Sequence, residues 1–262
     1  MNLYDQKINY LVPVFNREKL IEETIESIVI DIENFNDKKI ILLDDGSEDA
    51  SLNIMKNFKV KNNLPFIEIH HQKNMGIVAA RNKLISLASN EAWLFLLDSD
   101  DKNIAGRTIQ ILKYMTKYNI NVCGAFLKCF GFRDDIFSYP SDNYTLKKMC
   151  KHIAVFGNPA VTFSPRIKSF LRYTVTPEDF NLFKDLADSE LKFGNICEPL
   201  VEYRTHFNQI TKEDWYKAPN VNIFTKAFNI FLIILDPKIS ISDKLWFLKH
   251  YLALGKIKSL FK

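Results

Sequence analysis

Short apolar runs alternate with longer amphipathic segments along the first part of the chain. Each run is bounded by polar or turn-forming residues, which is typical of a buried strand. Between the runs, apolar residues recur every three or four positions, which is typical of helices that pack on a sheet. This alternation predicts βαβ units and a largely parallel sheet. The predicted strands cover 8–14, 39–43, 66–69 and 93–97, and the predicted helices cover 18–32, about 47–58 and 77–87.

The alternation is less regular beyond residue 101. The chain contains no internal repeat and no low-complexity segment. Its 262 residues are enough for one large α/β domain, or for one domain with a small appendage. Here helices are predicted over 104–118, 144–156 and from 177 onward, strands over 121–130, 160–164 and 195–203, and a loop over 139–143.

The stretch from Trp93 to Asp101, WLFLLDSDD, joins an apolar run to a group of carboxylates. In open α/β sheets, ligands bind beyond the carboxyl ends of the strands. Asp98 and Asp100 are two positions apart, so on an extended backbone they point to the same side. Two carboxylates there suit Mg²⁺ or Mn²⁺ holding a diphosphate. The alternative is a solvated turn, and for Asp101 alone we favour a cap on the next helix.

Three loops with polar residues follow predicted strands. Pro13 to Asn16 follows the first strand, Asp44 to Ser47 the second, and Asp98 to Asp101 the fourth. Loops at the carboxyl ends of parallel strands share one edge of the sheet, so these groups can converge on one ligand. Ser47, with two acidic residues after it, also has the composition of a helix start.

Composition and missing motifs exclude other classes. No GxGxxG follows the first strand, which disfavours a dinucleotide-binding Rossmann enzyme, and the absence of GxxxxGK[ST] excludes a P-loop NTPase. A net charge of +4 is too small to indicate a nucleic-acid partner, and 47% hydrophobic residues are ordinary for a globular protein. The four cysteines form no CxxC pair, so we interpret them as reduced, mostly buried thiols of a cytosolic protein. With no signal-peptide pattern and no bilayer-spanning apolar stretch, a soluble or peripheral protein is predicted.

Six segments match the motifs of one enzyme family, in the family's order. They are LVPVFN (11–16), ILLDDGSEDAS (41–51), NMGIVAARN (74–82), WLFLLDSDD (93–101), the Glu178-Asp179 pair followed by Leu182-Phe183, and GNICEPLVEYRTHFNQIT (194–211). Over this span the chain resembles the family 2 glycosyltransferases of GT-A fold, of the bacterial type that builds surface polysaccharides. Each motif alone is a weak signal, but the ordered set makes a chance resemblance improbable.

The resemblance implies an α/β fold of GT-A type, a Rossmann-like nucleotide-binding sheet fused to an acceptor-binding region. The GT-A domain would cover 1–212. Within it, 1–101 would be the nucleotide-sugar-binding half, and 102–212 the half that holds the acceptor and the catalytic base. A C-terminal helical extension would cover 213–262.

The resemblance also implies which residues contact the nucleotide. Pro13, Val14 and Phe15 would line the base pocket. Asp45 would accept a hydrogen bond from the imide N–H of uracil or thymine. The alternative for Asp45 is a structural role at the end of a strand, as we expect for Asp44.

The sugar and phosphate contacts follow from other motifs of the resemblance. Arg81 would lie near the phosphates, which its fixed charge suits. Asp98 or Ser99 would contact the ribose, and Arg204 would approach the diphosphate from the far side. The alternative for Arg81 is an ion pair on the surface of its helix.

The metal and the catalytic base are implied in the same way. Asp100 would bind Mn²⁺ or Mg²⁺, with His206 approaching the metal from the far side. Asp179 would be the general base. Both His206 and Asp179 have simpler interpretations, as an ordinary packed histidine and as an acidic residue at a helix start.

The implied reaction moves a single sugar from a nucleotide-diphosphate sugar, UDP-linked, to a hydroxyl of a glycan or lipid-linked acceptor, with inversion at the anomeric carbon. Bacterial polysaccharide or lipooligosaccharide synthesis would be its setting. The chain lacks the Gln-x-x-Arg-Trp motif and the membrane helices of processive members. The rival hypotheses are a catalytically inactive binding protein of the same fold and a nucleotidyltransferase.

The segment 236–262 is basic, with six lysines against two aspartates. Ile241, Leu245, Trp246 and Leu248 fall at helical spacing, so the segment predicts an amphipathic helix. Such a helix can make a peripheral contact at the inner face of the cytoplasmic membrane. It can equally pack on the rest of the protein with its lysines in water, and the sequence leaves both alternatives open.

Overall fold

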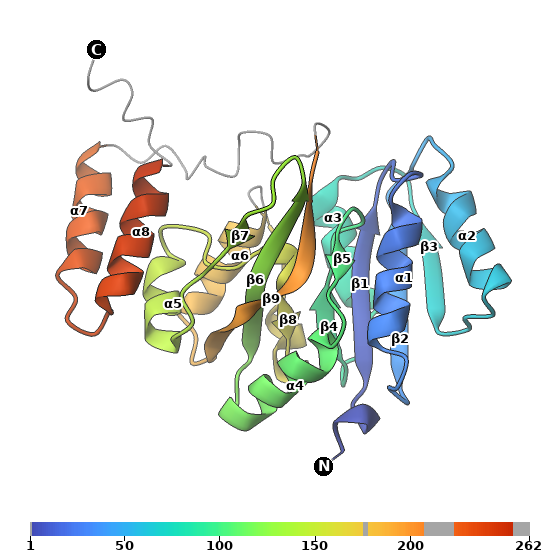
Figure 1. Cartoon of the computed structure of the whole chain (residues 1–262), viewed down its shortest axis with the longest axis horizontal. Helices are drawn as coiled ribbons and strands as arrows, with labels where there is room; N and C mark the ends of the chain where they lie inside the picture. Colours follow the sequence, from blue (N-terminus) through green and yellow to red (C-terminus); the bar gives the residue numbers. More distant parts are fainter. Residues whose placement is uncertain (1, 175–177, 207–222, 254–262) are drawn as a thin grey trace.

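The computed structural model describes residues 2–174, 178–206 and 223–253, and within these residues the strands form one nine-stranded sheet (Figure 1). Helices lie along both of its faces. The predicted α/β class is therefore confirmed. The strand order is β3 (Ile67–His71), β2 (Lys38–Asp44), β1 (Ile8–Val14), β4 (Trp93–Leu96), β8 (Thr162–Phe163), β6 (Val122–Gly131), β9 (Phe193–Thr205) and β5 (Lys102–Asn103), and β7 (Ile136–Phe137) pairs with β6 off this path.

The first four strands, β1 to β4, are parallel to their neighbours, as the sequence pattern predicts. The helices between them are α1 (Ile21–Asp31), α2 (Ser51–Lys61) and α3 (Ile77–Leu87). Side chains of α1 and α2 share a core with one face of β1, and α3 shares a core with the other face. Both faces of this part of the sheet are thus covered, which explains why β1, β2 and β4 are largely apolar runs.

β1 shows how these faces are packed. Tyr10 and Val12 belong to the core on the α1 side, while Leu11 belongs to the core on the α3 side with Leu84. All four side chains are at most 1% exposed. Burying an aliphatic side chain of this size contributes about 1.5–3 kcal/mol relative to leaving it in water.

Beyond β4 the sheet becomes mixed. β8 pairs antiparallel with both β4 and β6, whereas β9 runs parallel to β6 and antiparallel to β5. These pairings join the two halves of the chain in one sheet. The other elements of this part are α4 (Arg107–Tyr118), α5 (Asn143–Met149), α6 (Glu178–Ala187) and the short 3-10 helices η1 (Leu3–Asp5), η2 (Asn158–Ala160) and η3 (Pro165–Phe170).

The predicted helix over 144–156 is wrong in its second half. α5 begins after Asp142, whose carboxylate accepts two backbone N–H bonds of the first turn, and it ends at Met149. Phe156 is buried without being helical, and its ring lies 4.8 Å from that of Phe183 in α6. The apolar spacing beyond Met149 therefore reflects packing in the core and not continuation of the helix.

The predicted helix start at Ser47 is also wrong. α2 begins at Ser51, and Asp49 Oδ1 accepts a hydrogen bond from the Ser51 backbone N–H at 2.9 Å. Ser47 Oγ instead accepts from the backbone N–H of Asn16 at 2.9 Å. The serine therefore ties the loop after β2 to the loop after β1.

Two helices, α7 (Ile223–Ile234) and α8 (Ile241–Ala253), form the end of the molecule opposite α2 (Figure 1). α8 packs on the rest of the protein, because Phe247 is fully buried and the Trp246 indole donates to the Ser138 carbonyl at 2.7 Å. For this helix the packing alternative is the one observed, and 254–262 lies outside the described residues. Within the described ranges, every helix is too short or too polar to cross a membrane.

Candidate active site

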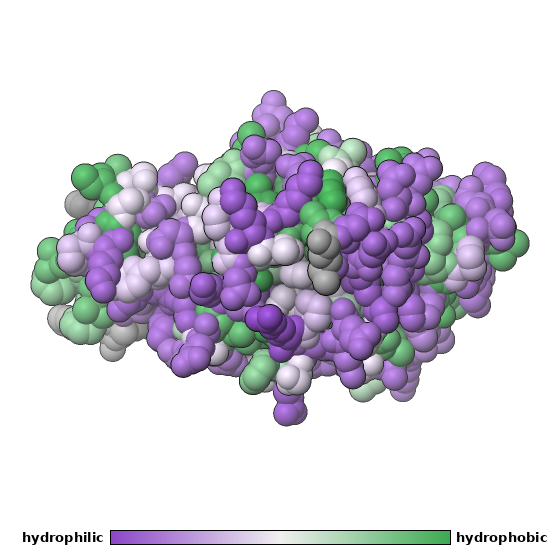
Figure 2. Space-filling model, turned by 90° about the horizontal axis from the view of Figure 1, so that it is seen from below, coloured by the Kyte–Doolittle hydropathy of each residue, from purple (hydrophilic) through white to green (hydrophobic). Residues whose placement is uncertain are grey.

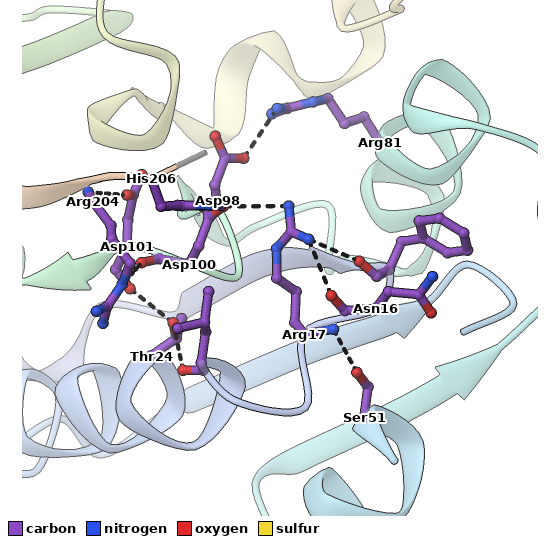
Figure 3. Close-up of polar contacts among 12 residues, drawn as sticks. Asn16, Arg17, Thr24, Ser51, Arg81, Asp98, Asp100, Asp101, Arg204 and His206 are labelled. Carbon is purple, nitrogen blue, oxygen red and sulfur yellow. Dashed lines mark hydrogen bonds and ion pairs between the residues drawn. The ribbon is translucent and has the colours of Figure 1, made fainter. Parts of the chain in front are cut away.

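The carboxyl ends of β1, β2 and β4 lie at one edge of the sheet, and the loops that leave them meet there (Figure 3). Val14 and Asp44, the last residues of β1 and β2, are in register. β4 ends opposite Leu11, so β1 extends past the end of β4. The Arg17 backbone N–H donates to Ser51 Oγ at 2.7 Å, which joins two of the loops directly.

Pro13, Val14 and Phe15, the residues predicted to line a base pocket, differ in what they expose. The Leu97 N–H donates to the Leu11 carbonyl, so the backbone N–H and C=O groups of odd-numbered residues of β1 point toward β4. Pro13 lies past the end of β4, where its missing N–H leaves no strand bond unmade. Val14 is buried in the core, whereas Phe15 is 41% exposed. Phe15 therefore presents the accessible aromatic ring of the three.

Asp45 holds the 72–76 loop that leads into α3. Its Oδ1 accepts from Gln72 Nε2 at 2.7 Å and from the Met75 N–H at 3.0 Å, and its Oδ2 accepts from the Gly76 N–H at 2.9 Å. A carboxylate has about four lone-pair positions, so Asp45 retains capacity for one further donor. Its predicted contact with the base stays a prediction.

The turn that carries Asp45 requires glycine at the next position. Gly46 has φ +75°, and a Cβ there would lie 2.6 Å from the backbone nitrogen of Asn74. The absence of a side chain at Gly46 lets the 72–76 loop approach the end of β2. On the other side of the turn, the buried Asp44 contacts His71 Nδ1 at 2.7 Å, which fits the structural role expected for Asp44.

Asp98 and Asp100 lie in a turn and not on extended backbone, so the expected same-side geometry is wrong. The Asp101 N–H donates to the Asp98 carbonyl at 3.1 Å. The two side chains consequently separate, and each meets a different cation. Asp98 Oδ1 accepts from Arg81 Nη2 at 3.0 Å, whereas Asp100 Oδ2 lies 3.3 Å from Arg17 Nη2 (Figure 3).

Asp101 does not cap the next helix, which corrects our expectation. α4 begins after Gly106, which has no side-chain cap. Asp101 is instead fully buried, and its Oδ1 accepts from the Arg204 backbone N–H at 2.8 Å. Burial and the charges of Asp100 and Asp98 raise the pKa of Asp101 well above its usual value. The residue fastens the 98–101 turn to the end of β9.

Arg17 is a residue at this site that the motif analysis did not select. Its Nη1 donates to the carbonyls of Phe15 and Asn16, which holds the guanidinium over the end of β1. Its Nε is buried without a hydrogen-bond partner in the described part of the chain. The signal in the sequence was its position directly after LVPVFN, at the mouth of the predicted site.

Asp100 is held between the Arg17 guanidinium and the His206 imidazole. His206 Nε2 lies 3.0 Å from Asp100 Oδ2, on the same oxygen that faces Arg17. Burial alone would raise the pKa of Asp100, but the hydrogen bond from His206 and the charge on Arg17 outweigh it and hold that pKa below its usual value. The structure thus brings together Asp100 and His206, the two residues predicted to bind a metal.

Arg204 braces the backbone of the 98–101 turn. Its Nε donates to the Asp100 carbonyl at 2.9 Å, its Nη2 donates to Glu23 Oε2 at 2.8 Å, and its guanidinium stacks 4.4 Å from the Phe130 ring. These contacts place Arg204 beside the turn as a positioning group. Its predicted approach to a diphosphate is a separate property that these contacts do not test.

Arg81 lies on the side of the 98–101 turn away from Arg204, and Ser99 lies within the turn (Figure 3). Arg81 is 7% exposed and Ser99 is 6% exposed. Besides its ion pair with Asp98, the Arg81 guanidinium lies 5.6 Å from the centre of the Tyr173 ring. It also donates hydrogen bonds to the Asn158 side-chain oxygen when the Asn158 amide is oriented with that oxygen toward Arg81. Arg81 is therefore a nearly buried cation of the site, in contrast to the surface alternative.

A buried polar network lies beneath the turn. Arg107 is 0% exposed, and it donates to the Leu96 carbonyl at 2.9 Å and to Asn103 Oδ1 at 2.8 Å. Asn103 in turn donates to the Tyr10 hydroxyl at 2.8 Å. Asp31 accepts from the Thr108 backbone and hydroxyl, which extends the network to α1. The network fixes the end of β4, and hence where the 98–101 turn starts.

Asp179 lies on α6, in its first turn. Its Oδ1 accepts from the backbone N–H of Phe180 at 2.7 Å, and its side chain is partly exposed. Leu182 and Phe183 of the same helix are buried in the core that contains Phe163. The helix is thus fixed by packing, with Asp179 at its accessible end.

The donor set at Asp100 fits a shared metal site. A carboxylate and an imidazole meet there, and the described residues contain no cluster of three or more metal-binding side chains. Mg²⁺ and Mn²⁺ are commonly bound by one or two carboxylates, with phosphates and water as the remaining ligands. Asp100 and His206 could therefore supply part of a ligand set that a diphosphate and water would complete.

The family model for glycosyl transferase family 2 matches residues 10–173, well over half of the chain. The chain belongs to glycosyl transferase family 2. The match includes the loops after β1, β2 and β4, and it ends before α6. This confirms the family that the motifs indicated.

Relatives of known name share this part of the chain. A cholesterol galactosyltransferase of Borreliella burgdorferi is 32% identical over 168 residues, which cover 59% of this chain and 45% of that protein. A poly(ribitol-phosphate) beta-glucosyltransferase of Bacillus spizizenii is 41% identical over 96 residues, covering 36% of this chain and 15% of that protein. The matched part thus spans less than half the length of these relatives.

Solved glycosyltransferases share the whole fold. S. aureus TarS 1–349, in complex with UDP-GlcNAc, has a TM-score of 0.67 at 16% identity, covering 98% of this chain and 76% of that one. Mannosyltransferase PcManGT from Pyrobaculum calidifontis, in complex with GDP-Man and Mn²⁺, has a TM-score of 0.61 at 12% identity, covering 99% and 76%. At these identities the likeness shows the fold, which is the GT-A fold.

Proposed function

We propose that the protein is an active, inverting glycosyltransferase. It moves a single sugar from a UDP-linked donor to a hydroxyl of a glycan or lipid-linked acceptor. The observation that carries this proposal is the meeting of Asp100, Arg17 and His206 at the carboxyl edge of the sheet. A carboxylate that can bind a cation, beside an arginine whose Nε has no hydrogen-bond partner among the described residues, is an arrangement that suits a metal–diphosphate.

The proposed donor site follows the edge of the sheet. Phe15 contacts the base, with Pro13 and Val14 behind it, and Asp45 accepts from the uracil imide. Asp98 or Ser99 contacts the ribose, and Arg81 supports Asp98 in that position through their ion pair of 3.0 Å. Support for UDP as the carrier is the complex of TarS with UDP-GlcNAc, a neighbour of the same fold.

Metal dependence is part of the proposal. Asp100 and His206 would hold Mn²⁺ or Mg²⁺, and the cation would neutralise negative charge on the leaving diphosphate. Arg17 stays beside Asp100 and supplies a second positive charge toward the phosphates. Its guanidinium is held by two backbone carbonyls, so it is positioned before the donor arrives.

Asp179 is the proposed general base. It takes the proton from the acceptor hydroxyl as that oxygen bonds to the anomeric carbon, while the bond from this carbon to the diphosphate oxygen breaks. One displacement of this kind inverts the anomeric configuration. A positioned base typically contributes about 10²–10⁴-fold to the rate.

The acceptor is proposed to be a growing glycan, free or lipid-linked, and not a nucleic acid. The two named relatives act on cholesterol and on poly(ribitol-phosphate), as their names state, so hydroxyl acceptors of both lipid and polymer type occur in this family. We place the reaction in the cytoplasm, in bacterial surface-glycan synthesis, with the protein peripheral to the inner face of the membrane.

The decisive experiment measures transfer and donor binding together. UDP-sugars and GDP-mannose are screened by thermal shift with and without Mn²⁺, and sugar transfer is followed with the donor that binds best. Asp100→Ala should remove the Mn²⁺-dependent part of the shift. Asp179→Asn should keep the shift and reduce transfer by about 10²-fold or more, because an amide cannot take the proton.

The same screen separates the rival hypotheses. Stabilisation by a nucleoside triphosphate, but by no sugar nucleotide, would favour a nucleotidyltransferase. Donor binding without transfer to any hydroxyl acceptor, in the wild type and in Asp179→Asn alike, would favour an inactive binding protein. Near wild-type turnover of Asp179→Asn would show that another group is the base.

A further inference from the structure

α7 carries an apolar stripe that faces solvent. The spacing i, i+3, i+4, i+7 places Phe228, Phe231, Leu232 and Leu235 on one side. Leu235 directly follows the helix, and its N–H continues the last turn by donating to the Phe231 carbonyl at 3.0 Å. Their exposed fractions are 59%, 58%, 48% and 60%. Ile233, between them in sequence, is 1% exposed and packs inward. The helix is thus apolar on both sides, whereas a surface helix is ordinarily polar on its outer side.

The stripe borders a basic hollow between α5 and α7. This hollow, of about 950 Å³, is lined by four lysines and one aspartate together with the α7 side chains. Lys148 and Lys238 are exposed and lie 5.7 and 5.3 Å from the Tyr144 ring. The aspartate, Asp236, already accepts from the Tyr144 hydroxyl at 2.5 Å. The surface therefore combines apolar side chains with an excess of positive charge.

This end of the molecule projects away from the candidate active site. α7 and α8 lie at the extreme of the long axis, and hydrophobic residues gather there in the space-filling view (Figures 1 and 2). Ile241 and Leu245 of α8, which are 78% and 61% exposed, extend the apolar area beyond α7.

We propose that this surface, which we call the α7 face, binds an anionic phospholipid bilayer. Protruding phenylalanine and leucine side chains enter the boundary between headgroups and acyl chains, and flanking lysines meet lipid phosphates. Protein–protein interfaces, in contrast, are depleted in lysine relative to the rest of the surface. The inference rests on the peripheral location proposed above and names the surface that makes the contact, which is α7 with the lysines beside it and not the inward-packed residues of α8.

The test is co-sedimentation of the full-length protein with vesicles of phosphatidylcholine, with and without about one third phosphatidylglycerol. We expect binding to the anionic vesicles at low salt and release at high salt, because the lysine contribution is screened. Phe231→Ser combined with Leu235→Ser should reduce binding by about tenfold or more. Lys148→Gln and Lys238→Gln should each reduce it about fivefold, the effect of one lysine near an anionic surface.

The matched controls lie on α2, at the opposite end of the molecule. Val60 is 78% exposed, and Lys59 and Lys61 flank it, so Val60→Ser and Lys59→Gln should leave vesicle binding and thermal stability unchanged. Equal binding of the wild type and the Phe231→Ser, Leu235→Ser variant would overturn the proposal. The proposal would also be overturned if the protein did not bind vesicles and instead formed a dimer that Phe231→Ser and Leu235→Ser dissociate. A second copy would then cover the α7 face.

Discussion

At the scale of single residues, the candidate site depends on groups that no motif marks. The carboxylates Asp98, Asp100 and Asp101 are recognisable in the sequence because three acids follow an apolar run. Arg17 is separated from them by most of the first half of the chain, yet it lies 3.3 Å from Asp100. Nothing in the spacing of residues reveals such a contact, because it depends on how β1 and β4 end.

Gly46 offers a direct test of the loop arrangement. Gly46→Ala should destabilise the protein by about 3 kcal/mol, because the left-handed backbone costs about 1–2 kcal/mol and the new Cβ would meet the Asn74 backbone. Gly106→Ala is the control. Its φ is +84°, but the nearest atom belongs to the flexible side chain of Gln110, so only the backbone cost of about 1–2 kcal/mol is expected. Urea unfolding of both variants measures the difference, and equal losses would contradict the close approach.

Arg107 tests the network beneath the 98–101 turn. Arg107→Met should destabilise the protein by about 3 kcal/mol, because the Leu96 carbonyl and Asn103 lose a charged donor in a buried place. The matched control is Lys113→Met, an exposed position on the same helix, where a change within about 0.5 kcal/mol is expected. Urea titration measures the free energy of unfolding of Arg107→Met and of Lys113→Met. A small loss for Arg107→Met would mean that water replaces the guanidinium.

At the scale of elements, the sequence predicts the parallel half of the sheet well. The strands β1, β2 and β4 are mostly buried, so each is a nearly uninterrupted apolar run with little competing interpretation, whereas β3, at the edge of the sheet, is only partly buried. The predictions fail where an element is short or its partner is distant. β8 has two residues, and its pairing with β4 and β6 depends on the whole sheet. α5 was predicted too long because core residues beyond Met149 mimic a helical spacing.

α8 allows the packing of the C-terminal helices to be measured. Phe247 is fully buried, whereas Leu245 is 61% exposed on the same helix. Phe247→Ala should cost about 3–5 kcal/mol of unfolding free energy, and Leu245→Ala should change it by no more than about 0.5 kcal/mol. Thermal denaturation followed by circular dichroism distinguishes the two. Equal, small effects would place α8 outside the cooperative unit.

At the scale of the whole molecule, two half-buried histidines should lower the free energy of unfolding as the pH falls below neutrality, in opposition to Asp101, whose raised pKa acts the other way. Burial, with nearby lysines, lowers the pKa of His152 below 6.5, and burial lowers that of His250. The unfolded chain therefore binds protons that these imidazoles do not bind when folded. Their contribution is fully present above pH 6.5 and is lost as the pH falls from there through the folded pKa values.

Urea titrations between pH 5 and pH 7.5 test this sign. His152→Gln should flatten the decline, because one of the two groups is removed, while Lys113→Met, an exposed substitution that removes no imidazole, serves as the control. A decline of the same slope in His152→Gln would assign the acid sensitivity to other groups.

The bond between Asp101 and the Arg204 backbone, 2.8 Å long, has a consequence for how the protein is made. The two residues are separated by 103 positions, so the turn at 98–101 lacks this anchor while β9 is still inside the ribosome. β1 to β4 can pair as soon as they emerge, because their partners are near in sequence. A nascent chain released before Thr205 would therefore hold a folded sheet with an unfinished site. Cotranslational acquisition of ligand binding is accordingly a late event in the synthesis of this chain.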